Sequence, residues 1–327
     1  MTSRYNRQEL LSFIGQAGQR KLLKSAAAVI CLGALGTVAA ELLARSGVGR
    51  LIIVDRDIVE LTDLQRQLLY DESDIGKPKA AAAADKLKRI NSGISVAAAA
   101  NDIGYKNIAS IIGKPAVILD CTDNMETRFL INEYCLKNRL AWVHAAAIRE
   151  TGQLAVFDFR GNDRRKPCYA CIFGNSAAEG TCDTVGVLVA ATAAIASLQA
   201  AEAIKLLTGK ATAPNLRRLN VWDSNFVGID VKKKSNCGSC GMENYDYLSG
   251  KKGSKIASLC GKDAYQVKGK PVDIAALKLR LQKIGAVSDF GDCISFRNIT
   301  AFKDGRALVK AKSAKEAKST YSKYVGA

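Results

Sequence analysis

The stretch SAAAVICLGALGTVAAELLARSGVGRLIIVDRD, residues 25–57, constrains the fold of this chain more than any other. An apolar run leads into the glycine turn GALG at residues 33–36, and an amphipathic segment and a second apolar run follow. This order predicts a strand, a tight turn, a helix and a parallel strand, which together form a βαβ unit. Such a unit belongs to an open sheet with helices on its faces.

The same alternation continues along the chain. Strand and helix patterns follow one another at residues 77–91 (helix), 94–100 and 116–123 (strands), 126–139 (helix) and 140–148 (strand). We therefore expect an α/β fold: a doubly wound, mostly parallel Rossmann-like sheet with its ligand at the carboxyl ends of the strands. Added antiparallel strands are expected at residues 151–159 and 216–232, and a helical segment at residues 5–24.

A boundary between two domains is expected near residues 241–255, which are rich in Gly, Lys and Ser. We assign residues 1–244 to the large α/β domain and residues 245–327 to a small basic α+β domain. The small domain holds 17 Lys and Arg against 7 Asp and Glu, a net charge of +10 out of +17 for the chain. Its lysines are scattered and no nucleic-acid-binding module is evident, so we expect a solvated face or an acidic protein partner, and no specific nucleic acid.

Residues 186–209 form a long apolar segment. Gln199, Glu202 and Lys205 interrupt it, which favours a buried or subunit-interface helix over a membrane span. The first residues, MTSRYNRQELLSF, are polar and basic, so we expect no signal peptide and a cytoplasmic protein. In that compartment, ten cysteines indicate metal binding or thiol chemistry rather than a disulfide framework.

The glycine turn is a candidate phosphate-binding site. It lies between a strand and a helix, where unpaired amide N–H groups and the helix dipole favour an anion, so we assign Gly33, Ala34 and Gly36 to nucleotide binding. Cys31 stands where the full dinucleotide fingerprint has a glycine, and a plain tight βα turn remains the alternative. Asp55 closes the second strand, where a carboxylate can bind ribose hydroxyls.

Cations near the same strand ends distinguish this site from that of a dehydrogenase. Arg66 and Lys79 follow the second strand, and Arg7 lies near the start of the chain. A nicotinamide cofactor needs few such charges, whereas a triphosphate attacked at phosphorus needs several donors to neutralise growing negative charge. Asp123, at the end of a predicted strand, is placed to hold Mg²⁺ against phosphate oxygens. Each charge taken alone is also compatible with an ordinary surface position.

The cysteines fall into two groups. Two CxxC pairs predict a closed, structural zinc site with four thiolate ligands: Cys168, Cys171, Cys237 and Cys240. Cys182 lies outside both pairs in a small, polar loop, where it is either a plain exposed thiol or a nucleophile. The single histidine, His144, lies in an apolar strand pattern and is expected to be packed there rather than catalytic, which argues against Ser/His and Cys/His triads.

In this order and spacing, RYNRQ, GALG, DRDIVELTDLQRQ, GKPKA, DCTDN, PCYAC, TC and CGSC resemble the MoeB/ThiF adenylyltransferases, relatives of ubiquitin-activating enzymes, over about residues 4–241. The resemblance implies a homodimer that binds ATP and Mg²⁺, adenylates the C-terminal glycine of a ubiquitin-like sulfur-carrier protein and releases pyrophosphate. The downstream process would be molybdopterin or thiamine synthesis, tRNA thiolation or protein conjugation. Because no rhodanese-like segment is evident, sulfur would come from another protein, a rhodanese or a cysteine desulfurase.

The resemblance also implies roles for individual residues. Asp55 would bind the ribose, Arg66 and Lys79 the phosphates, and Asp123 the magnesium ion, while Arg7 would reach into the partner's ATP. Nucleotide binding would also involve Asp57 and Gln67, and Cys182 would form a covalent link with the carrier. Asp63 departs from the family, which usually has Asn there, and places an anion near the phosphates.

A carboxylate terminus is already anionic at neutral pH, so the implied chemistry requires positioning and charge neutralisation and no catalytic base. Two alternatives remain open. An NAD-dependent oxidoreductase on the same fold would leave the extra cations and both CxxC pairs without a purpose. A nonenzymatic, zinc-stabilised scaffold that holds partners through the basic domain would release no pyrophosphate.

Overall fold

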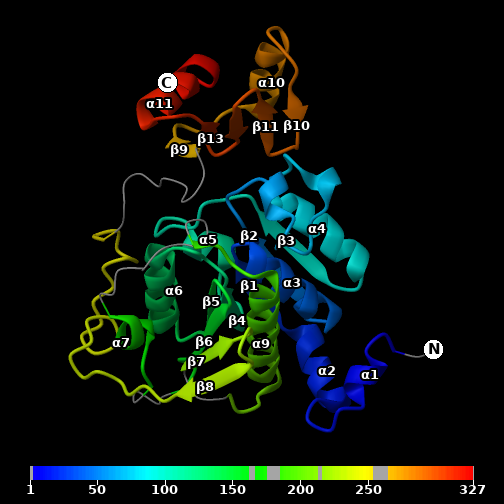
Figure 1. Ribbon diagram of the computed structural model, residues 1–327, viewed down its shortest axis with the longest axis vertical. Helices are drawn as coiled ribbons and strands as arrows, with labels where there is room; N and C mark the ends of the chain where they lie inside the picture. Colours follow the sequence, from blue (N-terminus) through cyan, green and yellow to red (C-terminus); the bar gives the residue numbers. More distant parts are fainter. Residues whose placement is uncertain (1–2, 162–165, 175–184, 213–215, 253–263, 327) are drawn as a thin grey trace. The chain divides into compact units, whose positions relative to one another are not determined.

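The computed structural model describes residues 3–161, 166–174, 185–212, 216–252 and 264–326. The chain divides into two compact units. The first comprises Met1–Ile75 and Lys79–Gly253, and the second comprises Gly76–Pro78 and Ser254–Ala327 (Figure 1). Each unit has its own sheet, so each is described by itself.

The first unit is built on an eight-stranded sheet of order β3-β2-β1-β4-β5-β6-β7-β8. Strands β1 to β5 are parallel to their neighbours, and β6, β7 and β8 are added antiparallel to them. The predicted mostly parallel sheet with added antiparallel strands is therefore confirmed. The strands are β1 (Ala26–Ile30), β2 (Arg50–Val54), β3 (Ser95–Ala99), β4 (Val117–Asp120), β5 (Ala141–Ile148), β6 (Thr151–Asp158), β7 (Leu216–Asn220) and β8 (Asn225–Ile229).

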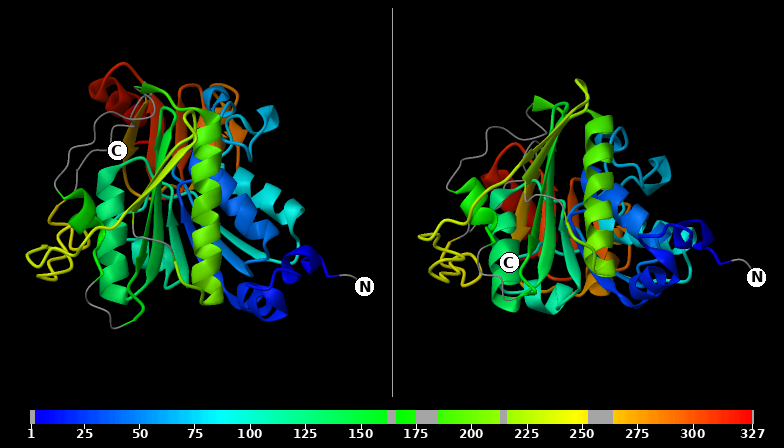
Figure 2. Two further views of the ribbon diagram at one scale, coloured as in Figure 1. Left: turned by 60° about the horizontal axis from the view of Figure 1, so that its bottom comes forward. Right: turned by 90° about the horizontal axis from the view of Figure 1, so that it is seen from below.

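Helices cover both faces of this sheet. Alternate residues of each strand point to opposite faces, and because the strand residues are apolar on both, each face is buried under helices. On one face, Ala27 and Val29 pack with α3 (Ala34–Arg45), α4 (Lys79–Ile90) and α9 (Val189–Thr208). On the other, Ala28 and Ile30 pack with α5 (Ile108–Ile112), α6 (Met125–Asn138) and α7 (Tyr169–Phe173). Figure 2 shows the sheet between α6 and α9. The described part of the unit also holds four short elements: α1 (Asn6–Glu9), α2 (Gly15–Lys24), and the 3₁₀ helices η1 (Leu61–Asp63) and η2 (Glu72–Asp74).

Helix α9 is long and apolar enough to cross a membrane by length and composition, but half of its most apolar window is buried inside the protein. Ile195 and Ala196 are fully buried in the core beneath the sheet. Gln199 donates hydrogen bonds to the backbone oxygens of Asp120 and Val143, both at 2.8 Å, and so ties the helix to β4 and β5. These contacts are those of a core helix, in agreement with the expectation of a buried helix.

The first unit extends to Gly253, which lies within the expected boundary stretch 241–255 but past the division drawn at residue 244. Tyr247 stacks on Phe129 of α6 with ring centroids 5.0 Å apart. Glu133 accepts a hydrogen bond from the backbone N–H of Leu248 at 2.8 Å. Residues 245–252 therefore pack with the large unit, because Tyr247 and Leu248 in this polar stretch are half-buried against the core that includes α6.

The second unit is a five-stranded antiparallel sheet of order β10-β11-β12-β13-β9. Leu277 and Tyr321, from the two helices that the structure describes in this unit, pack in one apolar core with Ile294 and Phe296 of the sheet. Asp273 and Ser313 cap the two helices through their side-chain oxygens. The elements are β9 (Ala264–Lys268), α10 (Ile274–Gln282), β10 (Ser288–Asp289), β11 (Cys293–Phe296), β12 (Ile299–Phe302), β13 (Arg306–Lys310) and α11 (Ala314–Tyr324).

Candidate nucleotide site and cysteine cluster

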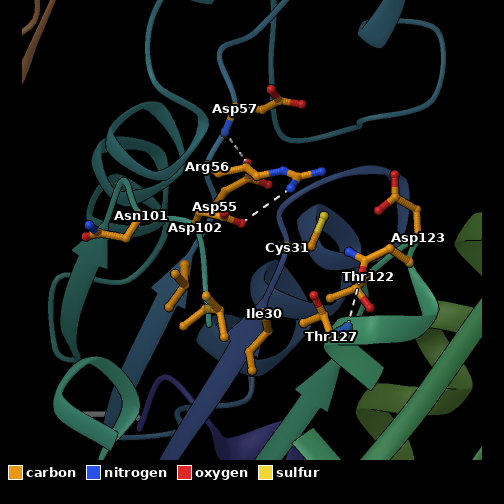
Figure 3. A pocket seen from close by; sticks show the side chains of 13 residues that line it. Ile30, Cys31, Asp55, Arg56, Asp57, Asn101, Asp102, Thr122, Asp123 and Thr127 are labelled. Carbon is orange, nitrogen blue, oxygen red and sulfur yellow. Dashed lines mark hydrogen bonds and ion pairs between the residues drawn. The ribbon is translucent and has the colours of Figure 1, made fainter. Parts of the chain in front are cut away.

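A pocket opens at the carboxyl ends of β1, β2 and β4 in the first unit (Figure 3). Strand β1 has β2 on one side and β4 on the other, so the pocket lies where the order of the sheet reverses. Open α/β sheets bind their ligands at such a switch point. The pocket is lined by Ile30, Cys31, Val54, Asp55, Arg56, Asp57, Asn101, Asp102, Ile103, Thr122, Asp123, Asn124 and Thr127.

The predicted glycine turn joins β1 to α3 at the edge of this pocket. Gly33 is the N-cap of α3. A side chain at Gly36 would meet the backbone oxygen of Cys31 at 1.9 Å, so only glycine fits there. Cys31 itself has φ +74°, in the left-handed region that favours glycine. Cys31 therefore adopts the backbone conformation that a glycine of the fingerprint would adopt. Because Cys31 carries a side chain, this conformation stores about 1–2 kcal/mol of strain.

Asp55 holds the turn in place. Its carboxylate accepts hydrogen bonds from the backbone N–H groups of Leu32 at 2.6 Å and Asp57 at 2.7 Å, and its side chain is buried. An ionised carboxylate has about four acceptor positions, so these bonds leave Asp55 able to accept from a ribose hydroxyl. The sequence indicated a ligand-binding role but not this structural one.

Arg66, Gln67 and Lys79 gather around Asp63, which is only 1% exposed. Asp63 lies 3.1 Å from Lys79 Nζ and 3.6 Å from Arg66 Nη2, and it accepts a hydrogen bond from Gln67 Nε2 at 2.7 Å. Lys79 also approaches Asp57, a pocket residue, at 4.0 Å. The cations predicted to bind phosphate are thus adjacent to the pocket but already paired with a buried carboxylate.

Further pocket residues were not singled out from the sequence. Arg56 Nη1 lies 3.3 Å from Asp102 Oδ1, beside Asn101, in the loop that follows β3 (Figure 3). Burial acts to lower the pKa of Arg56, but Asp102 and Asp57 raise it above its usual value. The only signal in the sequence was the position of residues 101–103, which directly follow the strand predicted at residues 94–100.

Carboxylates face the pocket from three sides, and they affect the thiol between them. In Figure 3, Cys31 lies between Asp55 and Asp123. Burial, followed by the charges of Asp55 and Asp123, raises the pKa of the Cys31 thiol well above its usual value. This thiol is therefore protonated at neutral pH, and the excess of negative charge favours a bound cation.

Asp123 is exposed at the pocket edge, in the loop between β4 and α6. Beneath this loop, Asp120 and His144 are buried and their side chains lie 2.7 Å apart. Burial lowers the pKa of His144 by more than the hydrogen bond to Asp120 raises it, so the ring is neutral and Nδ1 donates to the carboxylate. Burial acts to raise the pKa of Asp120, but His144 and Arg128 bring it below its usual value.

The two CxxC pairs come together, as the spacing predicted. All four sulfur atoms lie within 4.8 Å of one another, and three of the pairs are 3.4, 3.7 and 3.9 Å apart. Tetrahedral zinc with bonds of about 2.3 Å holds its sulfur ligands roughly 3.8 Å apart. Hydrogen bonding to Cys171 and Cys240 raises the pKa of Cys168, whereas hydrogen bonding to Cys168 lowers that of Cys171. This cluster can hold a metal ion.

Of the predicted nucleotide-site residues that the structure describes, Asp55, Asp57 and Asp123 line the pocket. The others do not line it: Arg7, Gly33, Ala34, Gly36, Arg66, Gln67 and Lys79. Arg7 is exposed on α1 and is not one of the residues that line it. Cys182 lies outside the described residues. His144 is fully buried in β5, as expected for a packed strand residue.

A pocket at the switch point of a doubly wound sheet, with a glycine turn at a helix start and a carboxylate after β2, defines a nucleotide-binding α/β protein. The model of the ThiF family matches residues 5–239, and the chain belongs to this family.

The chain is similar to proteins of this family over most of its length. It is 38% identical over 340 residues to the sulfur carrier protein ThiS adenylyltransferase of Bacillus subtilis (strain 168), with 100% of each chain covered. It is 36% identical over 244 residues to the molybdopterin-synthase adenylyltransferase of Escherichia coli (strain K12), covering 73% of this chain and 96% of the relative. The fold also resembles that of E. coli MccB, solved with ATP, with a TM-score of 0.64, 21% identity and 74% of each chain covered.

Proposed function

We propose that this protein is an adenylyltransferase that uses ATP to activate the C-terminal glycine of a ubiquitin-like sulfur-carrier protein. The observation that carries the proposal is the 38% identity, over the full length of both chains, to a ThiS adenylyltransferase. The pocket supports it, since its glycine turn and strand-end carboxylate suit a nucleotide. No observation favours the NAD-dependent alternative.

The residues in and beside the pocket divide into three groups in this proposal. The N–H groups at the start of α3, together with Arg66 and Lys79, bind the phosphates. Asp55 binds the ribose, with Asp57 beside it, and the loop after β3 contacts the base. The carrier's carboxylate attacks the α-phosphorus, an O–P bond forms, and the bond to pyrophosphate breaks. No residue has to remove a proton, because the nucleophile is already ionised.

Magnesium fits the residues present. Asp123 offers an exposed carboxylate at the pocket edge, and Mg²⁺ is usually held by one or two carboxylates plus substrate phosphates. Bound there, the ion would neutralise charge on the phosphates of ATP. Asp55 and Asp57 line the same pocket and add negative charge that favours a cation, whereas Asp102 is paired with Arg56.

The partner subunit completes the site in this proposal. Arg7 is exposed and lies away from the residues that line its own pocket, which supports a role in the ATP site of a second copy. The functional unit is then a homodimer, and each pocket receives one arginine from the neighbouring chain.

The cysteines serve structure and sulfur transfer. The Cys₄ cluster binds zinc, supported by its sulfur spacing, and stabilises the end of the first unit. The thiolate of Cys182 attacks the carbonyl of the acyl adenylate, so that a C–S bond forms and AMP leaves. A rhodanese or a cysteine desulfurase then supplies the sulfur. Four reduced thiols at one site suit the cytoplasm.

Exchange of labelled pyrophosphate into ATP tests the proposed function. The protein is incubated with carriers of the ThiS and MoaD type, each ending in glycine, and with the same carriers lacking that glycine. We expect exchange that requires ATP, Mg²⁺ and an intact carrier terminus. Exchange that proceeds equally without the terminal glycine would contradict the proposal.

A further inference from the structure

A buried pair of polar side chains lies directly beneath the loop that carries Asp123. Asp120 and His144 are 0% exposed, and they are register partners on the adjacent parallel strands β4 and β5. His144 Nδ1 lies 2.7 Å from Asp120 Oδ2. A polar group buried in this way is costly unless it is hydrogen-bonded, so the pair accounts for both side chains.

The other oxygen of Asp120 fixes Thr122. Asp120 Oδ1 accepts hydrogen bonds from the backbone N–H of Thr122 at 3.0 Å and from its hydroxyl at 2.7 Å. Arg128, on α6, donates through Nη2 to the backbone oxygen of Thr122 at 2.5 Å. The backbone N–H, the backbone oxygen and the side chain of Thr122 are therefore all held.

Asp123 is flanked by fixed residues on both sides. Thr122 precedes it, and Asn124 follows it and caps α6 by accepting from the N–H of Thr127 at 2.8 Å. The place of the Asp123 carboxylate at the pocket edge therefore depends on the anchors of its two neighbours. One anchor, Asp120, is in turn oriented by His144.

The surroundings of His144 are aromatic, and its bond to Asp120 is the only hydrogen bond of its side chain among the described residues. The rings of Tyr169 and Phe173 meet it edge to face at centroid distances of 5.1 and 5.5 Å, and Trp142 lies 6.2 Å away. Its Nε2 has no hydrogen-bond partner among the described residues. A phenylalanine would fill this apolar site without the cost of a buried imidazole, so the use of histidine is explained by the bond to Asp120.

We propose that His144 is a positioning residue of the metal-binding loop: through Asp120 it holds Thr122 and thereby places the Asp123 carboxylate for Mg²⁺. The inference rests on the proposed function, in which Asp123 binds the magnesium ion of ATP. It assigns His144 no contact with substrate and no proton transfer.

Four variants of the full-length protein test this inference. His144→Phe keeps the ring and removes the donor. The Asn and Gln variants carry the same amide group at two different distances from the backbone. The side-chain nitrogen of His144→Asn lies near the position of Nδ1, which bonds Asp120, and that of His144→Gln lies near the position of Nε2. Trp142→Phe is the matched control, because it alters a neighbouring buried ring on β5 whose nitrogen has no hydrogen-bond partner among the described residues.

Two measurements are made, and the first needs neither metal nor substrate. Amide hydrogen exchange of Thr122, measured without added nucleotide, reports whether its backbone N–H is still bonded to Asp120. Binding of Mn²⁺ in the presence of a non-cleavable ATP analogue, followed by electron paramagnetic resonance, reports whether the Asp123 carboxylate is placed to bind the metal. We expect His144→Phe and His144→Gln to lose about tenfold in both protection and Mn²⁺ affinity. His144→Asn and Trp142→Phe stay within about threefold of the wild type.

The inference is overturned if His144→Asn is as defective as His144→Gln, or if Thr122 exchanges equally in His144→Gln and Trp142→Phe. The Asn and Gln variants decide between these outcomes even if the Phe variant does not fold. Failure of the proposed function gives a different result: the wild type then shows no carrier-dependent pyrophosphate exchange, while the effect on Thr122 protection persists.

Discussion

Asp63 places a negative charge where the phosphates of ATP are expected, and its isosteric replacement by asparagine tests what that charge does. Asp63 is buried and pairs with Lys79 and Arg66. Asp63→Asn removes the charge with little change of shape. It leaves Lys79 buried with one fewer anion, until ATP supplies phosphate oxygens in its place.

The distances set the size of the effect. Lys79 Nζ lies 3.1 Å from Asp63 and 4.0 Å from Asp57. At an effective dielectric constant of about 20, the attractions are about 5 and about 4 kcal/mol. Removing one partner of a buried pair costs about 3–5 kcal/mol, and because Asp57 remains we expect about 3 kcal/mol. For a unit of this size, that lowers the Tm by about 6–12 °C.

Binding of ATP should recover part of this loss. If about 1.4 kcal/mol is recovered, the variant binds ATP about tenfold more tightly than the wild type, and saturating ATP raises its Tm by a larger increment. Calorimetric titration with ATP and thermal unfolding with and without ATP measure both effects. Asp85→Asn, the same change at an exposed position of α4, is the control.

The opposite role for Asp63 gives the opposite result. If Asp63 instead orients Lys79 toward the phosphates, Asp63→Asn binds ATP more weakly and shows a smaller Tm increment than the wild type. Weaker binding together with a lowered Tm would refute competition between Asp63 and phosphate.

Three further changes test the remaining assignments. Cys237→Ser should lose the single equivalent of zinc measured by elemental analysis and melt at lower temperature, since the binding energy of a structural site is folding energy; metal-free wild type with unchanged melting contradicts this. Cys31→Gly relieves the left-handed strain and should raise stability by about 1 kcal/mol, whereas a lower Tm would show that packing of the side chain outweighs the strain. Mixed dimers of Arg7→Ala and Asp123→Ala subunits should recover pyrophosphate exchange that neither parent has, and no recovery in confirmed heterodimers would exclude action of Arg7 across the interface.

The fold was largely predictable because periodicity reports burial. The alternation of apolar segments and the glycine turn located β1, α3 and β2, and the sheet around them followed from the rules of βαβ connection. The packing of residues 245–252 on the first unit was not predicted, because it depends on long-range partners that local pattern does not reveal.

The site was predictable where position along a strand determines the role. Asp55 and Asp123 lie at strand ends, and both line the pocket. Pairings across the structure were not predictable, because they depend on strand register and side-chain direction. The bond between Asp120 and His144 follows from their being register partners on β4 and β5, which no local pattern shows.

Carrier-dependent exchange of pyrophosphate into ATP, compared between the wild type and Asp123→Ala, tests the proposed adenylation most directly. We expect exchange by the wild type only with a carrier that ends in glycine. We also expect a loss of about a hundredfold or more in the variant, since a group that neutralises transition-state charge is removed. Wild-type exchange with an unaffected Asp123→Ala variant, or no exchange with any glycine-ended carrier, would contradict the assignment of this pocket to adenylation.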